Sequence, residues 1–211
     1  MERKMTFCAV FLVLAAGLPE RESKIMCLDS RGLAVDWFIV YKLPRDSKSS
    51  DPLIKEGVAH MYMDVNSQFF SRSTVSLKDT NQAVARTLQQ IYKNHKSQDV
   101  VYVMYNDDFP VGNGKAPSNG GHAKGDIAFD QKSGFWLIHS VPKFPRKSGE
   151  GYEWPSNAGE HGQSMLCISM KTSEFVKKSQ YKRGGGTVCF KNRAVWAAFK
   201  ELIAEFSECP A

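Results

Sequence analysis

The residues best suited to chemistry lie in one glycine-rich stretch, where His122 and Lys124 are separated by a single residue. Side chains of an extended strand alternate between its two faces, so these two would lie on the same face. A neutral imidazole can attack phosphorus or accept a proton, while an ammonium neutralises the non-bridging phosphate oxygens. Gly121 and Gly125 carry no side chain that would keep a polymer backbone away. The pair therefore predicts chemistry on a phosphate group.

A single His-x-Lys triplet is a weak signal, because a surface histidine beside a solvated lysine gives the same pattern. The chain has five histidines, and only His122 is followed two positions later by a lysine. If a site needs two such triplets, this chain supplies only one of them.

The composition is that of an ordinary globular protein of 211 residues, with 42% hydrophobic and 24% charged residues. These values exclude a disordered or membrane-embedded chain. The formal net charge of +6 gives weak support for an anionic partner, since many proteins with such a charge bind nothing acidic. Protonation of the histidines in acid would increase this charge.

Residues 1–18 are typical of a secretory signal peptide, because Arg3 and Lys4 precede an apolar run from Phe7 to Ala16. That run is too short to span a bilayer. We therefore expect a mature product that is lumenal or extracellular, with no membrane segment.

Four cysteines follow the signal peptide: Cys27, Cys167, Cys189 and Cys209. An even number in an oxidising compartment indicates disulfides, and four thiols allow three pairings. The chain has no Cys-x-x-Cys pair and no histidine at zinc-ligand spacing beside these residues. We therefore expect no metal site and no cofactor.

Hydrophobic patterning predicts several strands and two helices. Strands are expected at 34–43, 60–64, 100–105, 164–170 and 187–190, and helices from Asp79 or Thr80 to His95 and from 193 to 206. Proline, glycine and serine indicate loops at 45–56 and 106–121. Tyr152 and Trp154 could stack on bases or pack on the domain, and packing is the commoner role.

Two longer stretches carry a family resemblance: GHAKG at 121–125 followed by GFWLIHSVPKFP at 134–145, and VDWFIVYKLP at 35–44. They resemble the signature hairpin and the opening segment of the deoxyribonuclease II family. The resemblance implies an α+β or α/β fold with a phospholipase D-like sheet packed with helices. Residues 19–183 would form the N-terminal half of the family's pseudo-dimer, and residues 184–211 its C-terminal strand and helix after an internal deletion.

The resemblance also implies an activity, namely acid cleavage of DNA phosphodiesters to 3′-phosphate ends without metal. His122 would be the nucleophile that forms a phosphohistidine, and Lys124 would stabilise the phosphoryl oxygens. The family's second His-x-Lys, which supplies the general acid, has no counterpart here. Two copies could pair as a homodimer to complete the site on the DNA substrate, or the chain could be an inactive, nucleic-acid-binding form.

Further residues have candidate roles beside this pair. His139 resembles a position near the family's site, and it shares the face of His122 if it lies opposite Lys124 or Asp126 across the hairpin. The alternative is a packed histidine held by backbone hydrogen bonds. Asp130 could orient His122, although an aspartate in a turn is the commoner reading. The Cys27–Cys167 pair resembles a family disulfide, whereas Cys189 and Cys209 could pair with each other or stay free.

Overall fold

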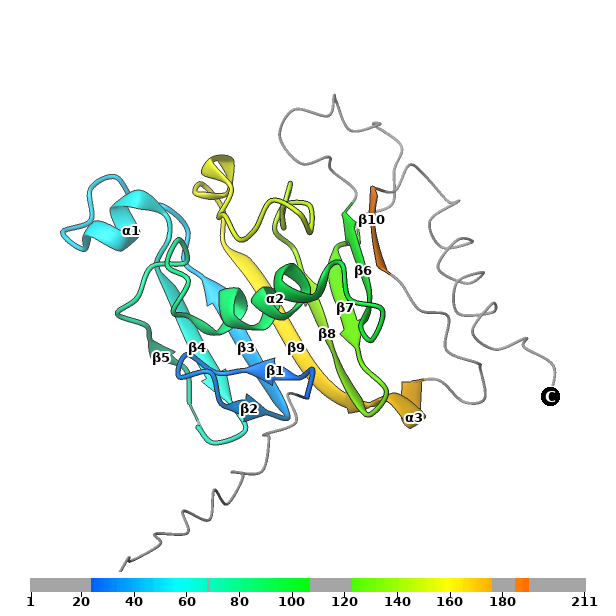
Figure 1. Cartoon of the computed structure of the whole chain (residues 1–211). Helices are drawn as coiled ribbons and strands as arrows, with labels where there is room; N and C mark the ends of the chain where they lie inside the picture. Colours follow the sequence, from blue (N-terminus) through cyan, green and yellow to red (C-terminus); the bar gives the residue numbers. More distant parts are fainter. Residues whose placement is uncertain (1–23, 68, 107–122, 176–184, 190–211) are drawn as a thin grey trace, which may run out of the picture.

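The computed structural model describes residues 24–67, 69–106, 123–175 and 185–189, and its main feature is an eight-stranded sheet (Figure 1). The strands lie in the order β10-β6-β7-β8-β9-β3-β4-β5. Their bounds are β3 (Trp37–Lys42), β4 (His60–Asp64), β5 (Ser71–Arg72), β6 (Val101–Asn106), β7 (Gly125–Phe129), β8 (Ser133–His139), β9 (Gln163–Lys171) and β10 (Gly185–Cys189). A separate small sheet pairs β1 (Cys27–Leu28) with β2 (Ala34–Val35).

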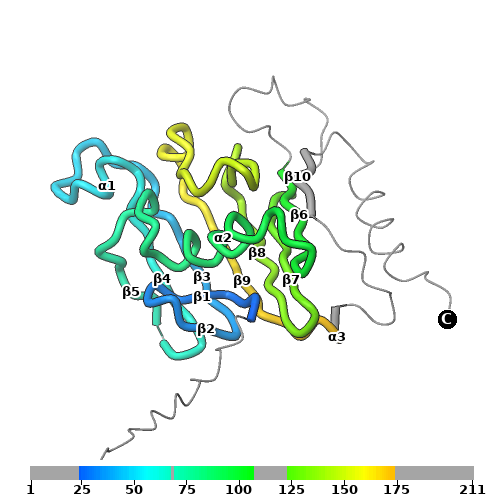
Figure 2. Tube along the Cα trace, viewed as in Figure 1, coloured from blue at the N-terminus to red at the C-terminus, as the bar shows by residue number. Residues whose placement is uncertain are grey.

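The large sheet is mostly antiparallel, and within the described part of the chain only β10 runs parallel to its neighbour, β6. Strands β9 and β3 lie side by side although more than a hundred residues separate them in the sequence (Figure 2). The predicted strands at 60–64, 100–105 and 164–170 are present within a residue or two. The one predicted at 34–43 is divided at Asp36 into β2 (Ala34–Val35), in the small sheet, and β3 (Trp37–Lys42), in the large one. This arrangement agrees with the α+β part of the expected fold class.

Helix α2 (Ala83–Asn94) crosses one face of the sheet (Figure 1). Its apolar stripe is buried, with Val84, Leu88 and Ile91 fully enclosed against the strands. The helix begins after Gln82, not at Asp79 or Thr80 as predicted. The Gln82 side chain accepts a hydrogen bond from the Val84 N–H at 2.7 Å, and such a cap satisfies an otherwise unpaired donor of the first turn.

The predicted loop at 45–56 is wrong at its end, where residues Pro52–Glu56 form helix α1. Asp51 caps this helix by accepting hydrogen bonds from the N–H groups of Leu53 and Ile54. Gly57 ends it in the left-handed conformation at φ 76°. A five-residue helix is too short to show an apolar period, so its capping residues are its main sequence signal. Two other short helical segments, η1 (Ser156–Ala158) and α3 (Thr172–Phe175), flank β9.

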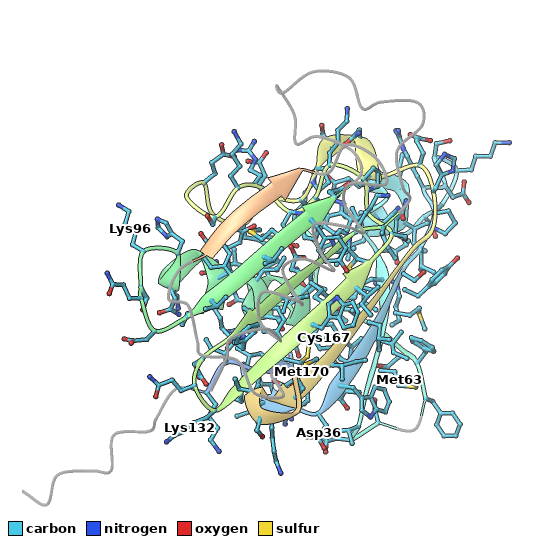
Figure 3. The ribbon with its side chains drawn as sticks, turned by 90° about the vertical axis from the view of Figure 1, so that its right-hand side faces the viewer. Asp36, Met63, Lys96, Lys132, Cys167 and Met170 are labelled. Carbon is cyan, nitrogen blue, oxygen red and sulfur yellow. A yellow bond between two sulfur atoms is a disulfide. The ribbon has the colours of Figure 1, made fainter. Side chains whose placement is uncertain are left out.

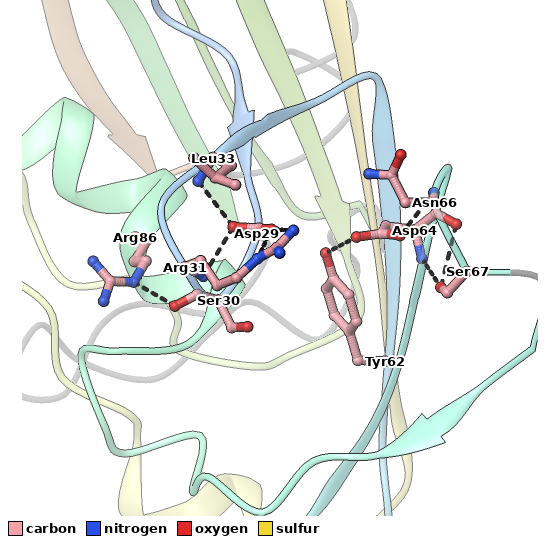
Figure 4. A network of polar contacts seen from close by, with 9 residues as sticks. All are labelled: Asp29, Ser30, Arg31, Leu33, Tyr62, Asp64, Asn66, Ser67 and Arg86. Carbon is pink, nitrogen blue, oxygen red and sulfur yellow. Dashed lines mark hydrogen bonds and ion pairs between the residues drawn. The ribbon is translucent and has the colours of Figure 1, made fainter.

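The N-terminal segment is fixed to the sheet by a covalent bond and by polar contacts. Cys27 in β1 forms a disulfide with Cys167 in β9, which confirms the expected pair and closes a separation of 140 residues. Such a long closed loop stabilises the fold by several kcal/mol. The turn between β1 and β2 is held by Asp29, which accepts hydrogen bonds from the N–H groups of Arg31 and Leu33 (Figure 4).

The face of the sheet under α2 also holds charged residues. Lys42 and His60 lie opposite each other on β3 and β4, and both are buried. The Lys42 ammonium donates hydrogen bonds to the carbonyl oxygens of Leu43 and Gly159, so it fastens the segment before β9 to β3. Burial lowers the pKa of Lys42 to about 8. Lys42 therefore has a structural role in the part of the chain that the structure describes.

His60 makes the stability of the fold depend on pH. Burial, followed by the charge of Arg72, lowers the pKa of His60 to about 4. Because the unfolded chain takes up this proton near its ordinary pKa of about 6.5, the unfolded state binds more protons between these values, and stability falls as the pH drops.

We predict that acidification from pH 7.5 to 5 lowers the free energy of unfolding by about 2 kcal/mol through His60. Urea denaturation of the wild type and of His60→Gln at both pH values measures this, and the variant should lose that part of the pH dependence. His161→Gln, which changes an exposed histidine, is the matched control. Equal pH dependence in wild type and His60→Gln would contradict the assignment.

Candidate functional site

The hairpin of β7 and β8 brings two of the predicted site residues into register. Gly125 lies opposite Ile138, and Asp126 lies opposite Leu137. One step further, the His139 N–H donates a hydrogen bond to the Lys124 carbonyl oxygen at 3.2 Å. Directly opposed residues of antiparallel strands point to the same face. His139 therefore lies on the face that carries Lys124 and Asp126, whereas His122 itself lies outside the described residues.

This face is the one covered by α2, and its polar side chains are deeply enclosed. Lys124 is 4% exposed and His139 is 6% exposed, while Asp126 has no exposed surface. Burial of charged groups on this scale is unusual unless they have partners. Lys124 is thus an enclosed residue among the described part of the chain, not one on the open rim of a groove.

The imidazole of His139 is held from two sides. Its Nδ1 atom accepts a hydrogen bond from the Val141 N–H at 3.2 Å, and its Nε2 atom lies 3.5 Å from Oδ2 of Asp126. Because Nδ1 acts as an acceptor, the neutral ring carries its proton on Nε2, which faces the carboxylate. The ring also meets the edge of Phe144, with the two centroids 5.5 Å apart.

Asp126 is the site residue that sequence reasoning missed. Burial raises the pKa of its carboxyl group above the ordinary range, and the neighbouring His139 imidazole opposes that shift. Its charge also contributes to raising the pKa of Tyr92 on α2, after burial of the Tyr92 ring itself. The available signal was its position two residues after Lys124, which places it on the same strand face.

Asn106 joins the end of β6 to the segment that follows β8. Its side-chain amide donates hydrogen bonds to the carbonyl oxygens of Val141 at 3.1 Å and Phe144 at 2.6 Å. Val141 in turn donates to His139. The end of β6 and the residues after β8 therefore form one hydrogen-bonded unit around the imidazole.

The glycine after Lys124 has a different role from the predicted one. A Cβ atom at Gly125 would lie 2.5 Å from the Tyr105 hydroxyl oxygen and 2.7 Å from the Leu137 carbonyl oxygen. The Tyr105 hydroxyl also accepts a hydrogen bond from the Trp136 indole at 3.0 Å. The space above Gly125 is thus filled by an aromatic side chain of the neighbouring strand, so it does not admit a polymer backbone.

Other candidate residues take structural roles. Asp130 accepts hydrogen bonds from the N–H groups of Lys132 and Ser133 through Oδ1, which is the turn role. Trp154 is buried, with its ring 5.1 Å from that of Phe144. The Tyr152 hydroxyl donates a hydrogen bond to the Leu77 carbonyl oxygen. These rings pack on the domain and do not form a stacking platform for bases.

Two further properties concern the described residues as a whole. No cluster of three or more histidine, cysteine, aspartate or glutamate side chains suited to a metal ion occurs among them. None of their helices has the length and apolar character needed to cross a membrane. Cys189 ends β10, and Cys209 and the predicted helix at 193–206 lie outside the described residues.

Comparison with known proteins identifies relatives over most of the chain. A family model described as Deoxyribonuclease II matches residues 26–178 and 176–209. Plancitoxin-1 of Acanthaster planci is 49% identical over 175 residues, which are 83% of this chain and 49% of the relative. Deoxyribonuclease-2-alpha of Mus musculus is 40% identical over 168 residues, which are 79% of this chain and 47% of the relative. Deoxyribonuclease-2-beta of Homo sapiens is 36% identical over 178 residues, which are 81% of this chain and 45% of the relative.

The family model and the deoxyribonuclease relatives indicate the same family. The chain spans about half the length of the curated relatives it matches. The first matched piece of the family model contains the whole β7–β8 hairpin, with Lys124, Asp126 and His139. The two matched pieces together cover nearly all of the chain after residue 25. The chain therefore belongs to the deoxyribonuclease II family.

Proposed function

We propose that this chain is an acid endodeoxyribonuclease that hydrolyses DNA phosphodiesters to 3′-phosphate ends without metal. The observation that carries the proposal is the hairpin, which sets Lys124, the last residue of the His122 triplet, opposite His139. The names of the mouse and human relatives, deoxyribonuclease-2-alpha and -beta, support the reaction and the DNA substrate.

The proposed reaction has two steps at phosphorus. An imidazole nitrogen of His122 attacks phosphorus, and the bond to the 5′ oxygen breaks as that oxygen receives a proton from a general acid. Water then attacks the phosphohistidine, giving up a proton to the same group and releasing the 3′-phosphate. The Lys124 ammonium stabilises the charge on the non-bridging oxygens. The reaction therefore needs a second group that first donates and then accepts a proton, and the family resemblance gives this role to a second imidazole.

We propose that a second copy of the chain supplies this imidazole. One His-x-Lys triplet per chain and about half the relatives' length support a homodimer in which two triplets meet at a twofold axis. The two pieces matched by the family model meet at residues 176–178, which supports residues 19–183 and 184–211 as parts joined across an internal deletion. The phospholipase D-like arrangement of two halves follows from the same proposal.

His139 acts as a positioning residue in this proposal, since its ring is enclosed and held by Val141 and Asp126. The buried carboxyl group of Asp126 faces the Nε2 atom of His139 and helps to fix the orientation of the ring. Burying this carboxyl group costs free energy, and the same burial raises the pKa of Asp126. A titratable group buried at such a cost favours a functional role over a packing role.

We propose a lysosomal or secreted location, supported by the predicted signal peptide at 1–18 and by the Cys27–Cys167 disulfide. A second candidate function is an inactive, nucleic-acid-binding form. The enclosure of Lys124 and the presence of half the family's length favour this alternative. The alternative would keep DNA binding and lose cleavage.

The first prediction concerns cleavage itself. Supercoiled plasmid at pH 5 in excess EDTA should be nicked by the wild type, and His122→Ala should reduce the rate by about 10³-fold or more because the nucleophile is gone. His161→Ala, at an exposed histidine, should cleave like the wild type. A folded wild type that leaves the plasmid intact would support the inactive form.

The second prediction tests the homodimer. If one composite site forms from two chains, equal co-expression of wild type and His122→Ala leaves about one quarter of the dimers with both imidazoles. Activity per total chain should then fall to about one quarter of the wild-type value. Independent monomers would give about one half. Sedimentation of the same mixture at pH 5 reports whether dimers are present.

The third prediction separates activity from stability at Asp126. Asp126→Asn keeps the shape but removes a charge that is costly to bury, so the free energy of unfolding should rise, more at pH 7.5 than at pH 4. The folded carboxyl binds its proton more tightly than the unfolded one, which gives this sign. Cleavage should fall about 10-fold or more through kcat, with KM unchanged. Lower stability with unchanged kcat would assign Asp126 to packing alone.

A further inference from the structure

One residue in the segment after β8 has an unusual backbone conformation. Lys143 has φ 57°, and it is the only residue other than glycine with a positive φ in the part of the chain that the structure describes. It follows Pro142, and a proline before a residue of positive φ is the pattern of a type II turn. Glycine or asparagine usually holds this position, because most other side chains strain it. A lysine at a strained position favours a functional role for its side chain.

The turn that contains Lys143 is held from both of its ends. The side-chain amide of Asn106 donates hydrogen bonds to the carbonyl oxygens of Val141 at 3.1 Å and Phe144 at 2.6 Å, which flank the two central residues of the turn. Val141 and Phe144 are buried, and the Phe144 ring lies 5.5 Å from the ring of His139. The neighbours of Lys143 therefore fix its backbone, and its side chain starts from a rigid base.

The same contacts place this turn beside the candidate site. The His139 N–H donates to the Lys124 carbonyl oxygen, and the Val141 N–H donates to the His139 ring. The ends of β6 and β8 and the start of β7 lie at one edge of the sheet, and the turn follows β8 at that edge (Figure 1). Lys143 is therefore four residues beyond His139, at the edge where β7 begins.

The charge of Lys143 is available for a ligand. Its side chain is partly exposed, and it has no ion pair or hydrogen bond among the described residues. Other basic residues of this edge have acidic partners: Arg146 pairs with Glu153 at 2.9 Å, and Arg45, beyond the end of β3, pairs with Glu160 at 3.0 Å. The Lys143 ammonium can therefore bind an anion without breaking an ion pair in the described structure.

We propose that Lys143 contacts the DNA substrate and that its ammonium binds a phosphate group next to the scissile one. Lys124 is only 4% exposed, so a strand on the surface of the molecule needs a further cation to hold it at this edge. Contacts to phosphate position a strand without reading its bases. Lys143 therefore contributes to the binding of any sequence and takes no part in breaking the bond. The choice of DNA rests on the proposed function, whereas the position of Lys143 does not.

The test is DNA binding in the His122→Ala background, where cleavage does not interfere. Fluorescence anisotropy at pH 5 measures the affinity for a labelled single strand at several salt concentrations. Lys143→Asn removes the charge but keeps a residue that tolerates a positive φ, so it should weaken binding about 3-fold or more. The slope of log K against log salt should decrease in size by about 0.7, the value for one phosphate contact on a single strand. Lys143→Arg, which retains the charge, should keep the slope of the parent.

The matched control is Lys96→Asn, which removes the same charge from an exposed lysine. Figure 3 shows Lys96 near the start of β6, and Asn106 is the last residue of that strand. The affinity and the salt slope of this variant should equal those of the parent. Equal weakening by Lys96→Asn would overturn the proposal, because the effect would then be general surface charge. Circular dichroism melting of each variant confirms that folding is retained.

The results for Lys143 and for catalysis can be told apart. If the wild type leaves plasmid intact while Lys143→Asn weakens strand binding as expected, the cleavage proposal fails and the phosphate contact stands. If the wild type nicks plasmid while Lys143→Asn binds the strand like the parent, cleavage stands and Lys143 belongs to the turn alone. A parent protein that binds no strand would also overturn the phosphate contact.

Discussion

The antiparallel register between β7 and β8 is the constraint on which the candidate site depends. It sets His139 against Lys124, and alternation along β7 then places Asp126 on the same face. A slip of one residue would turn His139 to the opposite face, away from the carboxylate and from α2. The three-residue turn at 130–132 holds the register, because Asp130 accepts hydrogen bonds from the N–H groups of residues 132 and 133.

The second constraint is electrostatic. The face beneath α2 encloses Lys42 and His60 on one pair of strands and Lys124, Asp126 and His139 on another. A hydrophobic layer would exclude such groups unless each gained a specific contact. Lys42 gains two carbonyl oxygens, which accounts for it as a structural residue. His139 and Asp126 meet at 3.5 Å without full hydrogen-bond pairing among the described residues, and the Nδ1 atom of His60 is likewise buried without a partner among them.

Sequence patterns predicted the central strands well, because runs such as Trp37–Lys42 are rich in β-branched and aromatic residues that suit a buried sheet. They did not predict α1, whose five residues are shorter than two helical turns. The residue that lies opposite His139 depends on where the β7–β8 turn begins. The composition does not fix that position to within one residue. Asp126 was missed because a single carboxylate in an apolar strand gives no period of its own. The roles of Tyr152 and Trp154 required the three-dimensional packing.

The disulfide between Cys27 and Cys167 makes the stability of the molecule depend on the compartment in which it folds. This bond forms in oxidising compartments and is rare in the cytosol. A copy left behind in the cytosol would keep β1 in place by hydrogen bonds and packing alone, with several kcal/mol less stability. Such a copy would unfold more often and be degraded sooner. Under the DNA-cleaving function proposed above, this difference would shorten the time during which misrouted molecules could reach the chromosomes of the same cell.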